Sequence, residues 1–418
     1  ELKWRSVLAV RFVAGGLCSL FGLSLGREGP SIQIGAAGAK AVSGLLGRSK
    51  VEEKYLITGG AAAGLAAAFN APLSGVIFAL EEVHRNFSPT IMLTATAASL
   101  VADFVSKYFF GLTPELHFTQ IPQMPIYMYF WMLPLGALTG LVGGFLNRAL
   151  LAAGPLSGRL LPARWRPAAV MLLSIPCGLF LPLTLGGGRD LIEFAQTATG
   201  GISLLLILLA VKFLFTCASF GSGVPGGIFM PILAVGTLTG SVFGITCVEL
   251  GLFPAQYIPD FAVCAMTAAL AAAVKAPITA ILRTVEMTGT LVHMLPVAAC
   301  AFAALLVSDL MKVEPIYEAL LNRSVEKERK APEAPKAPEG KNLMEIPVEL
   351  GSCAAERRID EIGWPVGTLI VSLIRGNRDI IPRGETTLLP GDYLVVLYPQ
   401  GQEQEVRAAV TDLCHEKF

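Results

Sequence analysis

The sequence predicts an all-α polytopic membrane protein with inverted repeats and broken, re-entrant helices, followed by a small soluble α+β domain. Of the 418 residues, 53% are hydrophobic and only 15% are charged, and the mean hydropathy is +0.61. A soluble domain carries roughly a quarter charged residues. Apolar segments interrupted by Gly and Pro occupy residues 1–322, and two stretches within them align with each other. From residue 323 onward the composition is that of a linker and a soluble domain.

The apolar segments are the first element of this prediction. Several of them are too short for a simple span of about 20 residues, and Gly or Pro interrupts many others. This pattern predicts broken, re-entrant or tilted helices instead of a bundle of straight ones. The segments lie at residues 6–25, 31–47, 56–82, 90–111, 126–152, 168–185, 201–220, 228–250, 260–285 and 291–311.

Composition and motifs argue against several other classes of protein. The net charge is zero, which provides no basic surface for nucleic acid. The eight cysteines show no C-x-x-C or zinc spacing and the four histidines do not cluster, so we expect no metal site. The sequence contains no H-E-x-x-H, no G-x-S-x-G and no intramembrane His–Asp pair. We therefore expect that the protein is not an enzyme and has no cofactor.

An internal repeat is the second element. LAAAFNAPLSGVIFALEE (65–82) aligns without gaps on LAAAVKAPITAILRTVEM (270–287), so that the Ala-Pro pairs and a late glutamate coincide. Upstream, GREGP (26–30) lies opposite GIFMP (227–231). Two halves with corresponding broken segments predict a binding site at the repeat interface, near mid-membrane. The paired breaks favour translocation over a pure ligand receptor.

The two Gly-Pro breaks have the form of helices that begin inside the membrane. A helix N-terminus presents unpaired N–H groups and a positive dipole end, which together attract an anion. Gly26 and Gly29 allow the backbone to approach closely. Pro30 and Pro231 suit the first helical position, where an N–H would have no partner anyway. GREGP and GIFMP therefore predict two half-helices aimed at an anion.

Arg27 and Glu28 place charge where an apolar stretch should continue. A charged carboxylate at bilayer depth costs about 2.5–3.5 kcal/mol on insertion scales. A helix N-terminus returns about 0.3–2 kcal/mol, and N–H donors add to this. Because the balance is close, the Glu28 carboxylate is a displaceable anion in an anion site, and protonation would release it. We therefore expect Glu28 to compete with the transported ion and to carry protons; the alternative interpretation is an ordinary surface turn.

GREGP, GSGVPGGIFMP and the Ala-Pro helix ending in FALEE resemble the chloride channel/transporter (CLC) family over residues 1–322. The resemblance implies an all-helical homodimer in which each subunit has a two-fold repeat and its own anion pathway. It also implies that Glu28 is the external gating glutamate. Fluoride-specific members of the family generally replace the proline of GREGP. Since Pro30 is kept here, we expect the transported anion to be chloride.

The same resemblance implies the anion ligands. The positions that match the half-helix whose amides bind the central anion are Gly227, Ile228, Phe229 and Pro231. Tyr317, in EPIYEALL, matches the tyrosine whose phenol donates to that anion. The family's first anion motif, Gly-Ser-Gly-Ile-Pro, should lie upstream of Glu1, so we expect this chain to be N-terminally truncated and its pathway incomplete. GSGVP (221–225) is continuous with GGIFMP and belongs to the later motif. We therefore do not assign the family serine's anion-binding role to Ser222.

Passive channels and proton-coupled exchangers of the family share the anion site. Glu82, in FALEEVHRNF, matches the position that takes up protons from the cytoplasm in exchangers and is typically apolar in channels. Together with Glu28 it provides two carboxylates separated by a membrane half-thickness, which suits a proton relay. The sequence therefore favours a secondary active chloride/proton antiporter, with two chlorides per proton implied by the family. A passive voltage- or ligand-gated chloride channel is the alternative.

The last part of the chain is soluble in composition. Residues 323–343 form a charged, Pro/Ala-rich linker. Residues 344–418 contain the expected strands IPVELGS, TLIVSLIRG and DYLVVLYP and a closing helix, and they resemble the RCK-C/TrkA-C domain. Such domains pair as dimers and bind small ligands. Regulation by an unidentified small ligand and a ligand-free dimer clamp both stay open, since no nucleotide fingerprint occurs.

These observations together predict where the protein works. We expect a multi-pass protein of the cell (plasma) membrane, in contact with the lipid bilayer, with a cytoplasmic C-terminal domain. Common animal members of the family carry a different cytosolic module, so the tail indicates a bacterial protein.

Overall fold

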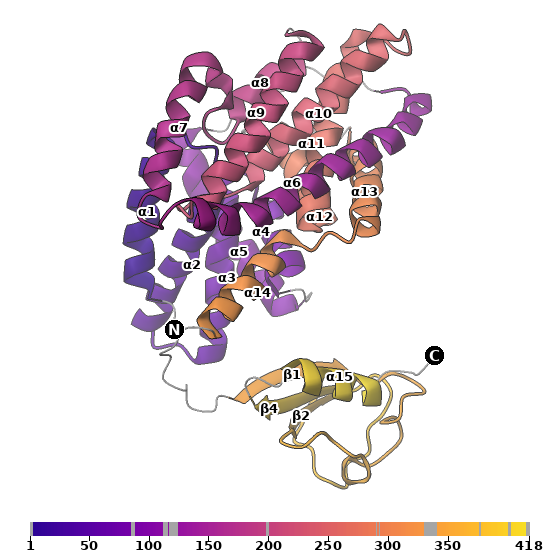
Figure 1. Ribbon diagram of the computed structural model, residues 1–418. Helices are drawn as coiled ribbons and strands as arrows, with labels where there is room; N and C mark the ends of the chain where they lie inside the picture. Colours follow the sequence, from indigo (N-terminus) through magenta and orange to yellow (C-terminus); the bar gives the residue numbers. More distant parts are fainter. Residues whose placement is uncertain are drawn as a thin grey trace. The chain divides into compact units, whose positions relative to one another are not determined.

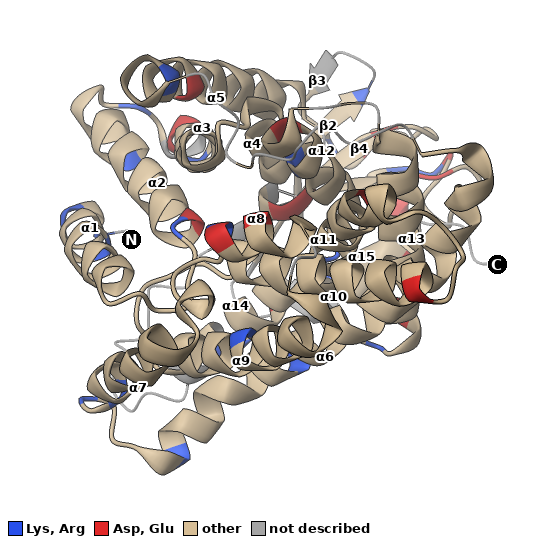
Figure 2. Cartoon of the chain, turned by 90° about the horizontal axis from the view of Figure 1, so that it is seen from above, with Lys and Arg blue, Asp and Glu red and all other residues tan. Residues whose placement is uncertain are grey.

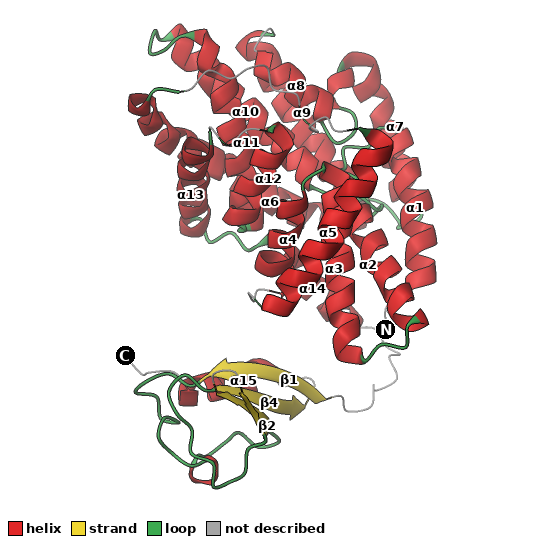
Figure 3. Ribbon diagram, turned by 180° about the vertical axis from the view of Figure 1, so that it is seen from behind, coloured by secondary structure: helices red, strands yellow, loops and turns green. Residues whose placement is uncertain are grey.

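The computed structural model describes the chain in two compact units, Glu1–Arg323 and Ser324–Phe418. The first unit is helical and the second contains a small β-sheet (Figures 1 and 3). The structure describes all residues except 1–2, 85–87, 112–115, 117–123, 198–199, 290, 292, 330–340, 376–377, 400–402 and 415–418.

The first unit is a sequence of helices of very unequal length. Within the described residues, five helical segments are long and apolar enough to cross a membrane: Pro89–Phe110, Ile126–Leu160, Gly201–Gly221, Phe229–Glu249 and Ala255–Val274. Charged residues occupy few positions on these helices (Figure 2). The helices are α1 (Trp4–Leu20), α2 (Glu28–Leu45), α3 (Lys50–Phe69), α4 (Pro72–Phe78), α5 (Pro89–Phe110), α6 (Met132–Leu160), α7 (Arg166–Phe180), α8 (Arg189–Thr197), α9 (Gly201–Gly221), α10 (Phe229–Glu249), α11 (Ile258–Val274), α12 (Pro277–Thr288), α13 (Met294–Leu310) and α14 (Ile316–Arg329), with the shorter turns η1 (Ala79–His84), η2 (Ile126–Trp131), η3 (Pro182–Thr184) and η4 (Ala255–Tyr257).

Two of the predicted apolar segments are each broken into two helices. Segment 56–82 is interrupted at Asn70, and segment 260–285 is interrupted at Lys275. Both residues adopt the left-handed conformation, with φ of 53° and 62°. Each is followed by Ala-Pro, and a residue before proline disfavours the helical region, so the helix ends there. The two breaks occupy equivalent positions of the repeat alignment.

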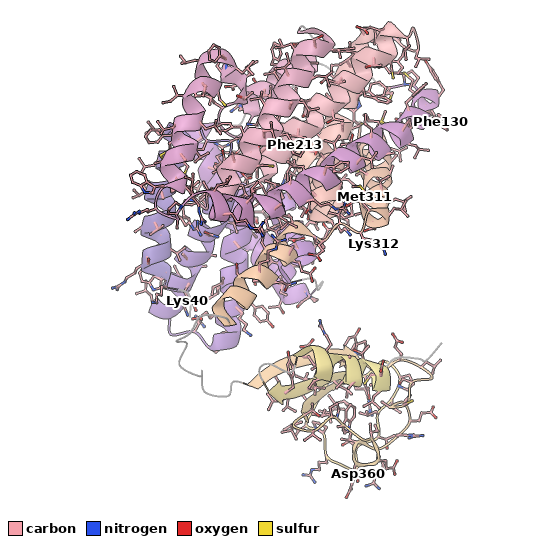
Figure 4. The ribbon with its side chains drawn as sticks, viewed as in Figure 1. Lys40, Phe130, Phe213, Met311, Lys312 and Asp360 are labelled. Atoms are coloured by element: carbon pink, nitrogen blue, oxygen red, sulfur yellow. The ribbon has the colours of Figure 1, made fainter. Side chains whose placement is uncertain are left out.

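Small residues let the helices of each repeat pack closely. α2 packs on α3, and α10 packs on α11. A Cβ at Gly35 would overlap the carbonyl of Gly60, and a Cβ at Gly236 would overlap the carbonyl of Ala265. Such close backbone approach is typical of helix pairs inside membranes. Lys40 of α2, labelled in Figure 4, also forms an ion pair with Glu53 of α3.

The late glutamates of the repeat cap helices of the opposite repeat. The Glu286 carboxylate accepts hydrogen bonds from the N–H groups of Leu73 and Ser74 at 2.8 and 2.7 Å, at the start of α4. The Glu81 carboxylate accepts from the N–H groups of Ile278 and Thr279 at 3.2 and 2.7 Å, at the start of α12. Each carboxylate satisfies N-terminal amides that would otherwise have no partner. The repeats therefore hold each other together through charge-assisted bonds.

In the described part of the second unit, four strands form an antiparallel sheet in the order β1-β4-β2-β3. One helix, α15 (Glu403–Cys414), packs on β1 and β4 and closes the core. The hydrophobic core includes Ile346, Leu373, Val396 and Val410. The strands are β1 (Lys341–Pro347), β2 (Leu369–Arg375), β3 (Arg378–Ile380) and β4 (Tyr393–Pro399).

Two predicted boundaries are wrong. IPVELGS is not a strand of its own, because β1 begins at Lys341 and ends at Pro347, paired along its whole length with β4. The soluble domain therefore begins before residue 344. Residues 323–329, assigned to an extended linker, continue α14 up to Arg329.

An ion pair with a buried carboxylate joins the end of β2 to the start of β4. The Asp392 carboxylate, 1% exposed, accepts from Arg375 Nε and Nη2 at 2.8 and 2.7 Å and from the Leu389 N–H at 2.8 Å. Burial alone raises the pKa of Asp392, but the bonds from Arg375 and Leu389 outweigh it and lower the pKa below its usual value. Asp392 is therefore ionised at neutral pH.

We expect Glu286→Ala to lower the free energy of unfolding by about 2 kcal/mol, because the first amides of α4 lose a charged acceptor. Unfolding in mixed detergent micelles, followed by circular dichroism, measures the change. The matched control is Glu314→Ala, which removes an exposed glutamate and should shift the value by less than about 0.5 kcal/mol. Equal effects of the two substitutions would contradict the capping role.

Candidate functional site

The site is built where the two helix breaks of the repeat meet. The N–H of Gly26 donates to the carbonyl of Gly227 at 2.8 Å, and the N–H of Gly227 donates to the carbonyl of Gly26 at 2.7 Å. Gly29 lies against the same backbone, because a Cβ there would be 3.1 Å from the Cα of Gly227. The aligned positions of the two halves thus touch directly, and the starts of α2 and α10 are held side by side.

Glu28 is the first residue of α2, and its side chain is fully buried. Its Oε1 accepts hydrogen bonds from the N–H of Phe229 at 2.6 Å and from the N–H of Met230 at 3.3 Å. These are the first two amides of α10. The carboxyl group therefore sits at the positive end of a helix of 21 residues, a position that stabilises an anion.

The glycines of the two breaks leave the space that the Glu28 carboxylate occupies. A Cβ at Gly26 or at Gly227 would overlap the carboxyl group of Glu28. Neither glycine has a positive φ, so the requirement is for space and not for an unusual backbone conformation. Gly227 was predicted to bind the anion, but its N–H is taken by Gly26. Its part in the site is to keep the position beside α10 open.

The prolines lie slightly deeper in the helices than predicted. Pro30 and Pro231 are the third residues of α2 and α10, not the first. Both still lie in the first turn, where a missing N–H costs no helical hydrogen bond.

Ile228 is the N-cap residue of α10 and is 1% exposed. Arg27, the N-cap residue of α2, lines a cavity of about 780 Å³ that Arg189 also borders.

The ring of Phe229 is the packing centre of the site. The ring of Tyr317, from α14, lies 5.6 Å from it between centroids, and the ring of Phe78 lies 6.3 Å from it. The guanidinium carbon of Arg283 lies 4.0 Å from the same ring centre. The structure therefore brings Tyr317 to the half-helix, as the sequence predicts. Arg283, Phe78 and the N–H of Met230 are site components that the sequence analysis missed.

Glu82 lies in η1, a π-helical turn in which it is half-buried. Single π-helical turns are frequent at functional sites. Its neighbour Glu81 accepts hydrogen bonds from the first amides of α12. Glu81, and not Glu82, therefore caps that helix. Tyr317 interacts electrostatically with both Glu28 and Glu82. The phenol of Tyr317 therefore lies within electrostatic range of both predicted carboxylates.

The sequence analysis found no His–Asp pair, but the structure contains a buried one in the first unit. Asp260, in the first turn of α11, and His293, the N-cap residue of α13, are both buried, with Oδ1 and Nδ1 2.8 Å apart. The packing of α11 on α13 brings them together. Within the described residues, no group of three or more His, Cys, Asp or Glu side chains could hold a metal ion.

Comparison with known proteins identifies the membrane unit. The model of the voltage gated chloride channel family matches residues 1–309, and the model of the TrkA-C domain matches residues 343–411. The chain belongs to the CLC family. The predicted resemblances of both parts are therefore confirmed, and so is the fold class.

The relatives of this CLC protein include named exchangers. The H(+)/Cl(−) exchange transporter ClcA of Yersinia pestis bv. Antiqua (strain Angola) is 34% identical over 341 residues, covering 79% of this chain and 71% of the relative. ClcA of Cronobacter sakazakii is 35% identical over 342 residues, covering 78% and 72%. The structure of a slow cyanobacterial Cl−/H+ antiporter has a TM-score of 0.74 and 31% identity, covering 79% of each chain. A CLC-type fluoride/proton antiporter shares the fold, with a TM-score of 0.60 and 24% identity over 73% of this chain and 79% of that one.

We expect Gly227→Ala in this CLC protein to push the Glu28 carboxylate off the first amides of α10, because the new Cβ takes its place. A cryo-electron microscopy or crystal structure of the variant would measure the distance from Glu28 Oε1 to the Phe229 nitrogen. Gly38→Ala is the control, since a Cβ at Gly38 meets no atom within 4 Å. A carboxylate that stayed in place in Gly227→Ala would contradict the requirement for space.

Proposed function

We propose that the protein is a secondary active chloride/proton antiporter. The observation that carries this proposal is the Glu28 carboxylate bound, fully buried, to the first two amides of α10. A carboxylate and a halide compete for the same donors, because both are anions that accept N–H bonds at a helix N-terminus. Protonation removes the charge of Glu28 and weakens its hold on the amides. Binding of chloride and binding of a proton are thereby coupled at one residue.

The ligands proposed for chloride are the N–H groups at the start of α10 together with the phenol of Tyr317. Ile228 and Phe229 position the helix end, and Tyr317 packs on the ring of Phe229. A hydroxyl and a row of amides stabilise an anion without a metal or a covalent intermediate. The proposed activity is transport, not enzymatic catalysis.

Glu82 is the proposed entry point for protons from the cytoplasm. It is half-buried and lies within electrostatic range of Tyr317, which is also within range of Glu28. A relay needs a second carboxylate on the way to Glu28, and a passive channel has no use for one. The exchangers among the relatives support this choice over the channel.

The surroundings of the transporter are part of the proposal. The family and the bacterial relatives support a homodimer in the cell membrane, in contact with lipid, with the TrkA-C domain in the cytoplasm. Arg27 and Arg189 border one cavity, and their positive charge suits the approach of an anion. An unidentified small ligand at the C-terminal domain would regulate transport.

We expect Glu28→Ala to retain chloride flux and to lose proton coupling, because the anion site keeps its amides but loses its titratable competitor. Liposomes with the reconstituted protein, in which chloride and pH are recorded together, measure both fluxes. Glu314→Ala provides the control for an exposed glutamate and should keep coupling. Uphill proton movement driven by chloride in Glu28→Ala would exclude this role. Chloride flux without proton movement in the wild-type protein would instead indicate a channel.

We expect Glu82→Val to abolish proton transport while chloride still moves, because the relay loses its inner carboxylate and the anion ligands are untouched. The same liposome recording gives the result. The matched control is Glu249→Val, at an exposed position at the end of α10. Intact coupling in Glu82→Val would place proton uptake on another group.

A further inference from the structure

Arg283 of α12 is a buried cation without a hydrogen-bond partner among the described residues. Its side chain is 0% exposed. Within the described residues, none of its nitrogens, Nε, Nη1 or Nη2, donates a hydrogen bond. Its guanidinium carbon lies 4.0 Å from the ring centre of Phe229 and 4.8 Å from that of Phe69. Contact with aromatic faces offsets only part of the cost of removing a guanidinium from water.

The internal repeat shows that the charge is not needed for packing. In the alignment of 65–82 with 270–287, Arg283 falls on Phe78. Phe78 also packs on the ring of Phe229, with centroids 6.3 Å apart and an edge-on geometry. An apolar side chain therefore fills the equivalent place in the other half. The two halves therefore differ at this position, because only the second half carries a guanidinium, with its positive charge and five N–H donors.

Arg283 lies next to residues of the proposed anion site. The residue whose ring it contacts, Phe229, gives its own N–H to Glu28. The guanidinium also interacts electrostatically with Tyr317, Glu28 and Glu286. The Glu286 carboxylate is engaged at the start of α4, and one oxygen of Glu28, Oε2, has no hydrogen-bond partner in the described structure. The helix end, the phenol and the guanidinium thus converge on one buried region.

We propose that Arg283 is a direct side-chain ligand of the transported anion, which is held between the guanidinium and the first amides of α10. This inference rests on the proposed function and adds a fixed positive charge to the anion site. The ligand class is a small monovalent anion. Chloride takes N–H donors in any orientation, whereas the planar fork of a guanidinium also fits nitrate through two parallel bonds. Arg283 therefore sets both the affinity for the anion and the selectivity between halide and nitrate.

The first test measures binding of chloride and nitrate to the purified full-length protein by isothermal titration calorimetry at one pH. We expect Arg283→Met to weaken chloride binding at least tenfold, which is about 1.4 kcal/mol. Arg283→Lys should recover part of the chloride affinity but bind nitrate less well relative to chloride, because an ammonium lacks the fork. Arg159→Met removes an exposed arginine and should change nothing. Equal chloride affinity in Arg283→Met and the wild-type protein would overturn the inference.

A second test needs no variant and covers the case in which Arg283→Met fails to fold. Crystals of the wild-type protein grown in bromide, measured at the bromine absorption edge, show where the anion binds. We expect an anomalous peak in direct contact with the guanidinium of Arg283. A peak confined to the amides of α10, or a guanidinium paired with the Glu28 carboxylate in its place, would overturn the inference.

The two proposals fail in distinguishable ways. If the wild-type protein exchanges chloride for protons and bromide avoids Arg283, only the role of Arg283 is wrong. If bromide contacts Arg283 but liposomes show no coupled transport, the proposed function is wrong and the anion ligand stands.

Discussion

The contact between the Glu28 carboxylate and the first amides of α10 is the interaction on which the arrangement of the membrane unit depends. A buried carboxylate is tolerated only where donors and a helix dipole replace water. That requirement explains why two glycines, Gly26 and Gly227, meet beside it, since any side chain there would occupy its place. It also explains why α10 begins in the interior and not at the surface of the unit.

Contacts between the two repeats hold the ends of their broken helices in place. Glu81 of the first repeat caps α12, and Glu286 of the second caps α4. The bridge between Gly26 and Gly227 is likewise shared by both halves. Because every one of these contacts crosses the repeat interface, neither half alone forms the site. The symmetry fails at several charged positions, among them Glu28, which is aligned with Phe229, and Arg283, which is aligned with Phe78.

Some other buried charged side chains in this protein have hydrogen-bond partners. The Lys212 ammonium donates to the carbonyls of Thr184 and Gly186 at 3.0 and 2.7 Å. Asp392, in the soluble unit, accepts from the Arg375 guanidinium and a backbone N–H. Such groups hold segments in place, because each lost bond would leave a charge without a partner. Arg283 differs in that, among the described residues, none of its donors has a hydrogen-bond partner, which suits a group that exchanges partners during transport.

The sequence by itself determined the membrane class, the two helix breaks, the gating role expected for Glu28 and the repeat that pairs 26–30 with 227–231. These depend on local signals: Gly and Pro end helices, and a charge inside an apolar stretch marks a function. Only the tertiary structure decided that Arg283 and Phe78 meet at Phe229, that Glu81 is a cap, and that His293 faces Asp260. Such contacts join residues far apart in the chain and follow from how the two repeats pack, which no local periodicity encodes.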